Sequence, residues 1–250
     1  MSLISILIVC LIAFLVCIFS VSVGGTSLVT VPVLISLGMI SKNAVATNMF
    51  ALIFLSLSGA AGFRKEIRIT DHKRFVLLSI LTICGSLLGA NFILSIEKDI
   101  LKKLIAIMIF FIAGSFLLKK DLGILEKKEK ISKLKFFGGA LLVFTLGIYG
   151  GFFSGGYVTF LSYVLILIFG LNFLQAAFVT KIFNIFSSLV ACAFFYYHDL
   201  IDLSVGIPLA FSMASGAFLG TKLALTKGNL WIRNLFIAVV IMLAINLLIF

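Results

Sequence analysis

Ten apolar runs occupy most of this chain and limit what it can fold into. They cover residues 3–23, 26–40, 44–63, 75–95, 101–118, 136–153, 157–170, 174–197, 203–221 and 231–250. A helix needs roughly 20 apolar residues to cross a bilayer, and most of the runs approach that length. Charged residues make up only 12% of the chain, whereas a soluble domain has about 25%. The sequence therefore predicts an all-α integral membrane protein.

The second half of the chain repeats features of the first. The segment GSLLGA at 85–90 returns 131 positions later as GAFLGT at 216–221. At the same offset, the pair Gly24-Gly25 has a counterpart in Gly155-Gly156. Duplicated membrane proteins are most often transporters with one central site between two halves. The duplication thus favours a transporter before any single residue is considered.

The charged loops give the repeat a direction across the membrane. Loops rich in Lys and Arg stay in the cytoplasm, and three loops have such an excess: 64–74, 119–135 and 222–233. The loop 198–202 contains two aspartates and neither Lys nor Arg, so it should face outward. This loop is the equivalent of the first basic loop in the other half, yet its charge is opposite. We therefore predict two inverted repeats of about five hydrophobic segments each, with both termini outside.

The stretch 119–135 joins the two halves and carries seven lysines against three acidic residues. We interpret it as a cytoplasmic, lysine-rich linker between a first transmembrane repeat at 1–118 and a second at 136–250. The net charge of +11 then reflects topology and contact with lipid headgroups. No stretch interleaves basic and aromatic residues as a nucleic-acid site would. The expected partners are the lipid bilayer and a small anion, and the oligomeric state stays open.

Two of the runs are near 15 residues long, and each follows a glycine pair. Each is either a short, steep crossing (a half-helix led by glycine) or the returning arm of a re-entrant hairpin, whose glycines face a cavity or protein. Helix N-termini present unpaired N–H groups and about half a positive charge, which suits an anion. The alternative is close helix packing through small residues. The candidate binding residues at these two ends are Gly24, Gly25, Thr26, Ser27, Gly155, Gly156 and Tyr157.

Polar residues inside two apolar runs are further candidates. Thr47 and Asn48 lie early in one run, and Thr180 and Lys181 hold matching positions in the second half. Lys181 is the only charged residue in the interior of any run, where a lysine costs at least ~2.5 kcal/mol. It either extends toward the interface or supplies a counter-charge for an anion, and Asn184 lies on the same helix face. Asn48 either contacts substrate or forms an interhelical hydrogen bond.

The apolar runs contain no Asp or Glu, which a membrane protease, a zinc enzyme or a carboxylate proton relay would need. His72 and His198 lie in or beside loops. The cysteines lie in apolar runs without metal-ligand spacing, and we interpret them as small buried hydrophobes: Cys10, Cys17, Cys84 and Cys192. We therefore expect no enzyme, no catalytic residue, no metal and no cofactor.

These motifs resemble the sulfite exporter TauE/SafE family of membrane transporters. The resemblance is carried by Gly24-Gly25 before a short helix with Pro32, then Gly38 and AVATN at 44–48, and by the similar pattern around Gly155-Gly156. It covers nearly the whole chain and implies transport of small anions such as sulfite, thiosulfate, sulfonates or organic acids. The second half departs from the family pattern, because Lys181 stands in a stretch that is usually more neutral.

We therefore expect a secondary transporter, an exporter of small anions, that works by alternating access between two inverted repeats. An anion channel and a non-transporting membrane scaffold are the alternatives.

Overall fold

The structure is a computed structural model that describes residues 1–64, 72–92, 123–126 and 131–249. Within these residues it contains eight helices and no strand: α1 (Leu3–Val23), α2 (Thr26–Ser36), α3 (Ser41–Arg64), α4 (His72–Phe92), α6 (Lys133–Phe152), α7 (Tyr157–Phe169), α8 (Phe173–Tyr197) and α9 (Leu203–Ile249). Six of them are long and apolar enough to cross a membrane. The predicted all-α membrane fold is therefore confirmed, while the run at 101–118 lies outside the described residues.

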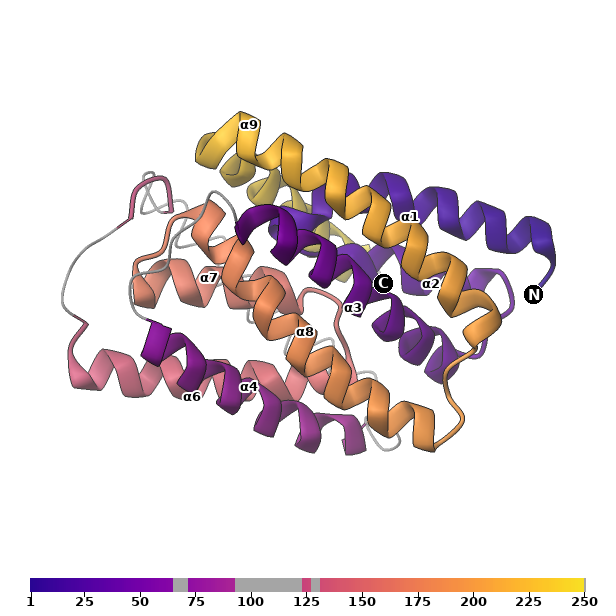
Figure 1. Ribbon diagram of the computed structural model, residues 1–250, viewed down its shortest axis with the longest axis horizontal. Helices are drawn as coiled ribbons and strands as arrows, with labels where there is room; N and C mark the ends of the chain where they lie inside the picture. The colour runs from indigo at the N-terminus through magenta and orange to yellow at the C-terminus, as the bar shows by residue number, and fades with distance from the viewer. Residues whose placement is uncertain (65–71, 93–122, 127–130, 250) are drawn as a thin grey trace.

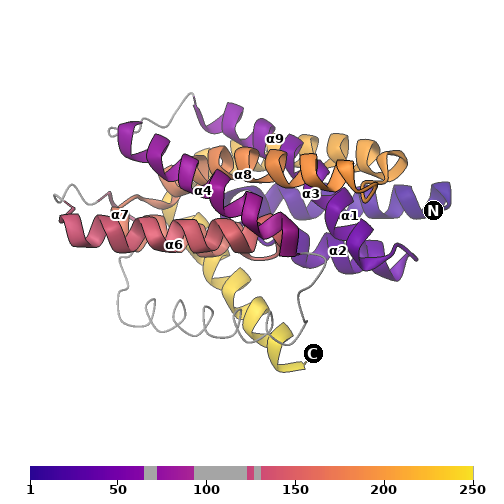
Figure 2. The ribbon, with the colours of Figure 1, turned by 90° about the horizontal axis from the view of Figure 1, so that it is seen from below.

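The last helix differs from the sequence prediction. A basic loop at 222–233 was expected between two runs, but α9 continues through it and is broken only at Gly228, where φ is 76° and ψ is −173°. Glycine adopts such a backbone conformation without the steric cost of a side chain. The predicted loop is therefore a kink. Figure 2 shows the helix beyond it leaving the other helices toward the C-terminus.

The chain folds back on itself at both glycine pairs. The ring of Phe169, at the end of α7, lies 6.1 Å from the ring of Phe136, near the start of α6. At the first pair, the hydroxyl oxygens of Ser20 and Thr26 are 2.6 Å apart across the turn, and Figure 1 shows α2 returning beside α1. Each short segment is thus the returning arm of a helical hairpin.

The two hairpins enter from opposite ends of the molecule, and their tips meet in the middle (Figure 1). The hydroxyl oxygens of Ser27 and Ser154 are 2.7 Å apart, and the Thr159 hydroxyl donates to the carbonyl of Val23 at 2.8 Å. A Cβ on Gly24 would lie 2.9 Å from the backbone nitrogen of Thr159. Glycine therefore allows the two tips to pack backbone against backbone.

The repeated glycine motif brings two further pairs of helices to backbone distance. In α4, Gly85 and Gly89 face the backbone of α6 around Ile148. In α9, Gly216 and Gly220 face the backbone of α1. Small residues permit this close approach between membrane helices. The glycine helix of each half therefore packs on the first helix of the other half.

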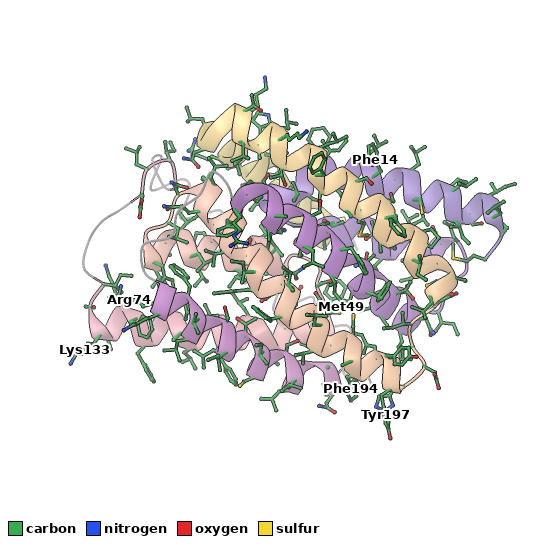
Figure 3. The ribbon with its side chains drawn as sticks, in the orientation of Figure 1. Phe14, Met49, Arg74, Lys133, Phe194 and Tyr197 are labelled. Carbon is green, nitrogen blue, oxygen red and sulfur yellow. The ribbon has the colours of Figure 1, made fainter. Side chains whose placement is uncertain are left out.

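The described residues of the basic stretches lie at one end of the molecule. Asn229, beside the kink in α9, donates its amide to the carbonyl of Ile124 in the linker at 3.1 Å. Figure 3 labels Arg74 and Lys133 at this end, and Tyr197, next to the aspartate-containing loop, at the other. This separation is what the predicted sidedness requires. The inverted arrangement across the membrane stays a prediction.

Candidate functional site

A small cavity lies where the two hairpin tips meet. The volume open to the centre of a water molecule is about 10 Å³, which is room for roughly one water. The tips are therefore closed around it in this conformation. Its polar lining is Gly24, Gly25, Thr26, Ser27, Ser154, Lys181 and Asn184, and its apolar lining is Leu52, Leu55 and Val158.

Helix α2 begins at this cavity without a side-chain cap. Its N-cap is Gly25, with φ 88°, and no side chain accepts from the first turn. Thr26 and Ser27, the first two helical residues, line the cavity. The first N–H groups of a helix have no acceptor within it. This helix start therefore offers backbone donors to a ligand in the cavity.

Lys181 reaches the same cavity from α8, in the other half of the chain. Its side chain is only 1% exposed. Gly59 of α3 leaves room for it, since a Cβ there would lie 3.2 Å from Cγ of the lysine. In the described part of the chain, no acidic side chain lines the cavity beside this ammonium group. The burial of Lys181 excludes the extension to the interface that the sequence left open.

Asn184 lies one helical turn beyond Lys181 and also lines the cavity. Its amide donates to the hydroxyl of Ser56 in α3, at 2.7 Å. An Asn amide has two N–H donors, so this bond fixes the side chain and leaves a second donor. α8 thus contributes both a cation and a neutral donor to the site.

Asn48 lies behind the start of α2, outside the cavity lining. Its amide donates to the Ser27 hydroxyl at 2.8 Å, and its carbonyl oxygen accepts from the Thr30 hydroxyl at 2.5 Å. The side chain is fully buried. Asn48 therefore positions Ser27, in the interhelical hydrogen-bond role that the sequence offered as one of its two interpretations.

Two predicted threonines point elsewhere. Thr180 donates to the carbonyl of Ala177 within its own helix, at 3.0 Å. The hydroxyl of Thr47 accepts from the backbone N–H of Asp202 at 3.0 Å, at the end of the molecule opposite the basic stretches. Neither residue lines the cavity.

The second glycine pair builds a hairpin tip and leaves the cavity wall to its neighbours. Gly156 is the N-cap of α7, with φ 80°. The ring of Tyr157 packs against α6, since a Cβ on Gly150 would lie 2.8 Å from it. Gly155, Gly156 and Tyr157 lie outside the cavity lining. From this hairpin only Ser154 and Val158 line the cavity. The site is therefore asymmetric, because the first hairpin contributes more of the lining residues than the second.

Sequence reasoning missed four lining residues. Ser154 had a signal, because it directly precedes a glycine pair just as Thr26-Ser27 directly follows the other. Leu52, Leu55 and Val158 had none, since 62% of the chain is hydrophobic and nothing sets these side chains apart.

Comparison with known proteins identifies the family. The chain matches the family described as sulfite exporter TauE/SafE over residues 9–247. It is 33% identical over 210 residues to the "Probable membrane transporter protein" of Haemophilus influenzae, which covers 84% of this chain and 81% of that protein. It is 28% identical over 230 residues to the "Probable membrane transporter protein YfcA" of Escherichia coli, with 90% and 82% covered. A third relative, the "Probable membrane transporter protein ORF9" of Sinorhizobium sp, is 26% identical over 225 residues, with 90% and 85% covered.

No solved structure matches the chain. The resemblance drawn from the glycine pairs is nevertheless confirmed by the family match, and the protein is a multi-pass membrane transporter. The chain belongs to the sulfite exporter TauE/SafE family.

Proposed function

We propose that this transporter exports small anions through the cavity between the hairpin tips. The observation that carries the proposal is that the buried cation of Lys181 and the uncapped start of α2 line one cavity. The substrates we propose are sulfite, thiosulfate, sulfonates or organic acids.

The chemistry of the polar lining supports an anionic substrate. The ammonium group of Lys181, the second N–H of Asn184 and the backbone N–H groups of Thr26 and Ser27 are all donors. Hydrogen bonds to an ionised partner are roughly twice as strong as those between neutral groups. An anion would thus replace its hydration shell with these donors.

The closed cavity supports alternating access. Space for about one water excludes a sulfite ion or anything larger, so substrate must enter a conformation in which the tips have separated. The tips are joined through hydroxyl contacts, Ser27 to Ser154 and Thr159 to Val23, and such contacts break at low cost. Movement of one hairpin relative to the other would expose the cavity to each side in turn.

The position of the described basic residues at one end of the molecule supports the predicted sidedness. We propose that the segments 64–74, 119–135 and 222–233 face the cytoplasm and that both termini lie outside. Export would then run from the basic end of the molecule toward the end that carries Asp199 and Asp202.

The test is anion binding and flux by purified protein in liposomes, with variants of the cavity lysine. Lys181→Met should weaken anion binding at least about tenfold, because it removes the full charge while keeping an unbranched side chain. Lys181→Arg should keep most of the affinity. Lys42→Met is the matched control, since it removes an exposed lysine in the first turn of α3. Equal affinity in all four proteins would refute the assignment of Lys181.

The same liposomes separate the alternatives. Saturable flux that unlabelled anion on the far side accelerates would indicate a carrier. Ohmic single-channel currents would indicate an anion channel instead. Absence of flux for sulfite, thiosulfate, sulfonates and carboxylates alike would favour a membrane scaffold.

A further inference from the structure

We propose that the cavity selects anions with one negative charge and a small apolar group over anions with two charges, so that among the proposed substrates a sulfonate is favoured over thiosulfate. This inference rests on the proposed function, because it concerns the substrate class of the same cavity. Three observations carry it: the number of full charges at the site, the arrangement of helix ends around it, and its apolar wall.

The cavity holds one full charge. Lys181 is the single ionised side chain among the described residues that line it, and the other polar groups are neutral hydroxyl, amide or backbone groups. One ammonium group neutralises one negative charge. A second negative charge would be buried without a partner, and an unpaired buried charge has a large unfavourable free energy.

The helix ends add donors but little net charge. At each tip the C-terminus of a long helix meets the N-terminus of a short one: α1 ends at Val23 before α2 begins at Thr26, and α6 ends at Phe152 before α7 begins at Tyr157. Helix ends carry about half a charge, positive at the N-terminus and negative at the C-terminus. Within each tip these partial charges oppose one another, so the ammonium group sets the charge balance.

The remaining wall is hydrocarbon. Leu52 and Leu55 lie on one face of α3, Val158 lies in the first turn of α7, and all three are buried. These side chains offer no hydrogen bond to an oxyanion and favour an apolar group. Once the tips have separated, a ligand with its charged head at Lys181 and a short alkyl group toward this wall would meet a matching group at each end.

Three sulfonates of the same carbon skeleton test the proposal on the full-length protein. Ethanesulfonate carries one charge, 1,2-ethanedisulfonate carries two, and 2-hydroxyethanesulfonate carries one charge and a polar tail. Sulfonates stay ionised at all working pH values, so protonation does not blur the comparison. Ethanesulfonate should compete at least about 30-fold more strongly than the disulfonate, and about three- to tenfold more strongly than the hydroxylated compound.

Two variants test the physical cause. Asn184→Lys adds a second cation to the cavity and should narrow the preference for the single charge by at least about tenfold. Leu55→Asn makes the wall polar at similar length and should remove the preference for the alkyl tail. Thermal unfolding in detergent verifies that each variant is folded. If Asn184→Lys does not fold, the comparison of the three sulfonates on the wild-type protein still tests the selectivity for one charge.

The outcomes separate this inference from the proposed function. Equal or stronger competition by the disulfonate would overturn the single-charge selectivity and leave anion transport standing. Failure of all three sulfonates, sulfite, thiosulfate and carboxylates to bind would overturn the proposed function and this inference together.

Discussion

Lys181 is held at the cavity by shape. The described lining places no carboxylate beside it, and its aliphatic stem lies against the space that Gly59 leaves open. Lysine stems pack well against apolar surface while the charged end seeks a polar site. The direction of this side chain thus depends on a residue that carries no side chain of its own.

Gly59→Ala should therefore disturb anion binding from outside the cavity. The added Cβ would lie 3.0 Å from Cγ2 of Val21 and 3.2 Å from Cγ of Lys181. Both side chains must then give way by a few tenths of an ångström, and the ammonium group shifts with the lysine stem. We expect about three- to tenfold weaker anion binding and a loss of about 1 kcal/mol in the free energy of unfolding. Competition binding and thermal unfolding in detergent measure the two effects.

The matched control for this change is Gly138→Ala, because nothing lies within 4 Å of a Cβ at that helical position. The stability loss of Gly59→Ala should shrink in a Lys181→Ala background, where the displaced stem is absent. An undiminished loss there would show that the lysine stem is not what the alanine displaces.

The buried hydrogen bonds of Asn48 lead to a second prediction at the scale of one residue. Asn48→Leu removes two buried hydrogen bonds, to Ser27 and to Thr30, at similar side-chain volume. The free energy of unfolding should fall by about 1–2 kcal/mol, measured in detergent. Thr47→Val removes one hydrogen bond of a residue outside the cavity lining, so it should leave anion affinity unchanged, whereas Asn48→Leu should weaken it. Unchanged affinity in both variants would contradict the positioning role of Asn48.

At the scale of elements, the first hairpin depends on a glycine before α2 and on another after it, for different reasons. Gly24 has φ 85°, and a Cβ there would lie 2.9 Å from the backbone of Thr159. Gly38, at the end of α2, has φ 96° with nothing within 4 Å of a Cβ. The first position therefore needs glycine for conformation and for space, and the second for conformation alone.

Alanine at these two positions separates the two contributions. Gly38→Ala should lower the free energy of unfolding by about 1–2 kcal/mol, the cost of a left-handed conformation with a side chain. Gly24→Ala should lower it by about 3 kcal/mol or more, since a clash with backbone adds to that cost. Thermal unfolding of the two variants in one detergent makes the comparison, and equal losses would mean that the tips are not tightly packed.

Most helices could be predicted from hydrophobicity, and the departures have local causes. The run at 3–23 coincides with α1. The run at 26–40 continues four residues past the end of α2 at Ser36, because Gly38 adopts a positive φ among residues that are still apolar. At 222–233 the basic residues suggested a loop, yet a helix end at the membrane surface accommodates them as well.

The site was harder to predict than the helices. Residues next to the first glycine pair, and Lys181, were found because polar residues are rare in the interior of apolar runs. The difference between Asn48, which positions Ser27, and Asn184, which lines the cavity, depends on side-chain direction between helices. Sequence patterns do not report that direction.

At the scale of the whole molecule, the contact between the hairpin tips predicts that a cross-link between them stops transport. Ser27 and Ser154 have their hydroxyl oxygens 2.7 Å apart, so cysteines at both positions should form a disulfide, which needs Cβ atoms about 4 Å apart. In a background without the four native cysteines, oxidation of the double variant should stop transport and a reductant should restore it. Each single cysteine variant is the control, and continued transport by the cross-linked protein would contradict alternating access.

The position of the charges predicts sidedness for the same molecule. Single cysteines in place of Lys133 and Tyr197, both exposed and at opposite ends of the structure, should react with an impermeant reagent from opposite sides of the membrane. Lys133→Cys should react from the cytoplasmic side. Labelling of both positions from the same side of the membrane would contradict the proposed topology.

The crossed packing of the glycine helices has a consequence for how the protein is made. Synthesis proceeds from the N-terminus, and domains generally form in that order. Here α4 can contact its backbone partner only after α6 has been inserted, and α1 can contact its own only after α9 has been made. Until these partners are made, the faces of α4 and α1 that will contact them are covered by lipid. The contact between α4 and α6 can therefore form before the contact between α1 and α9.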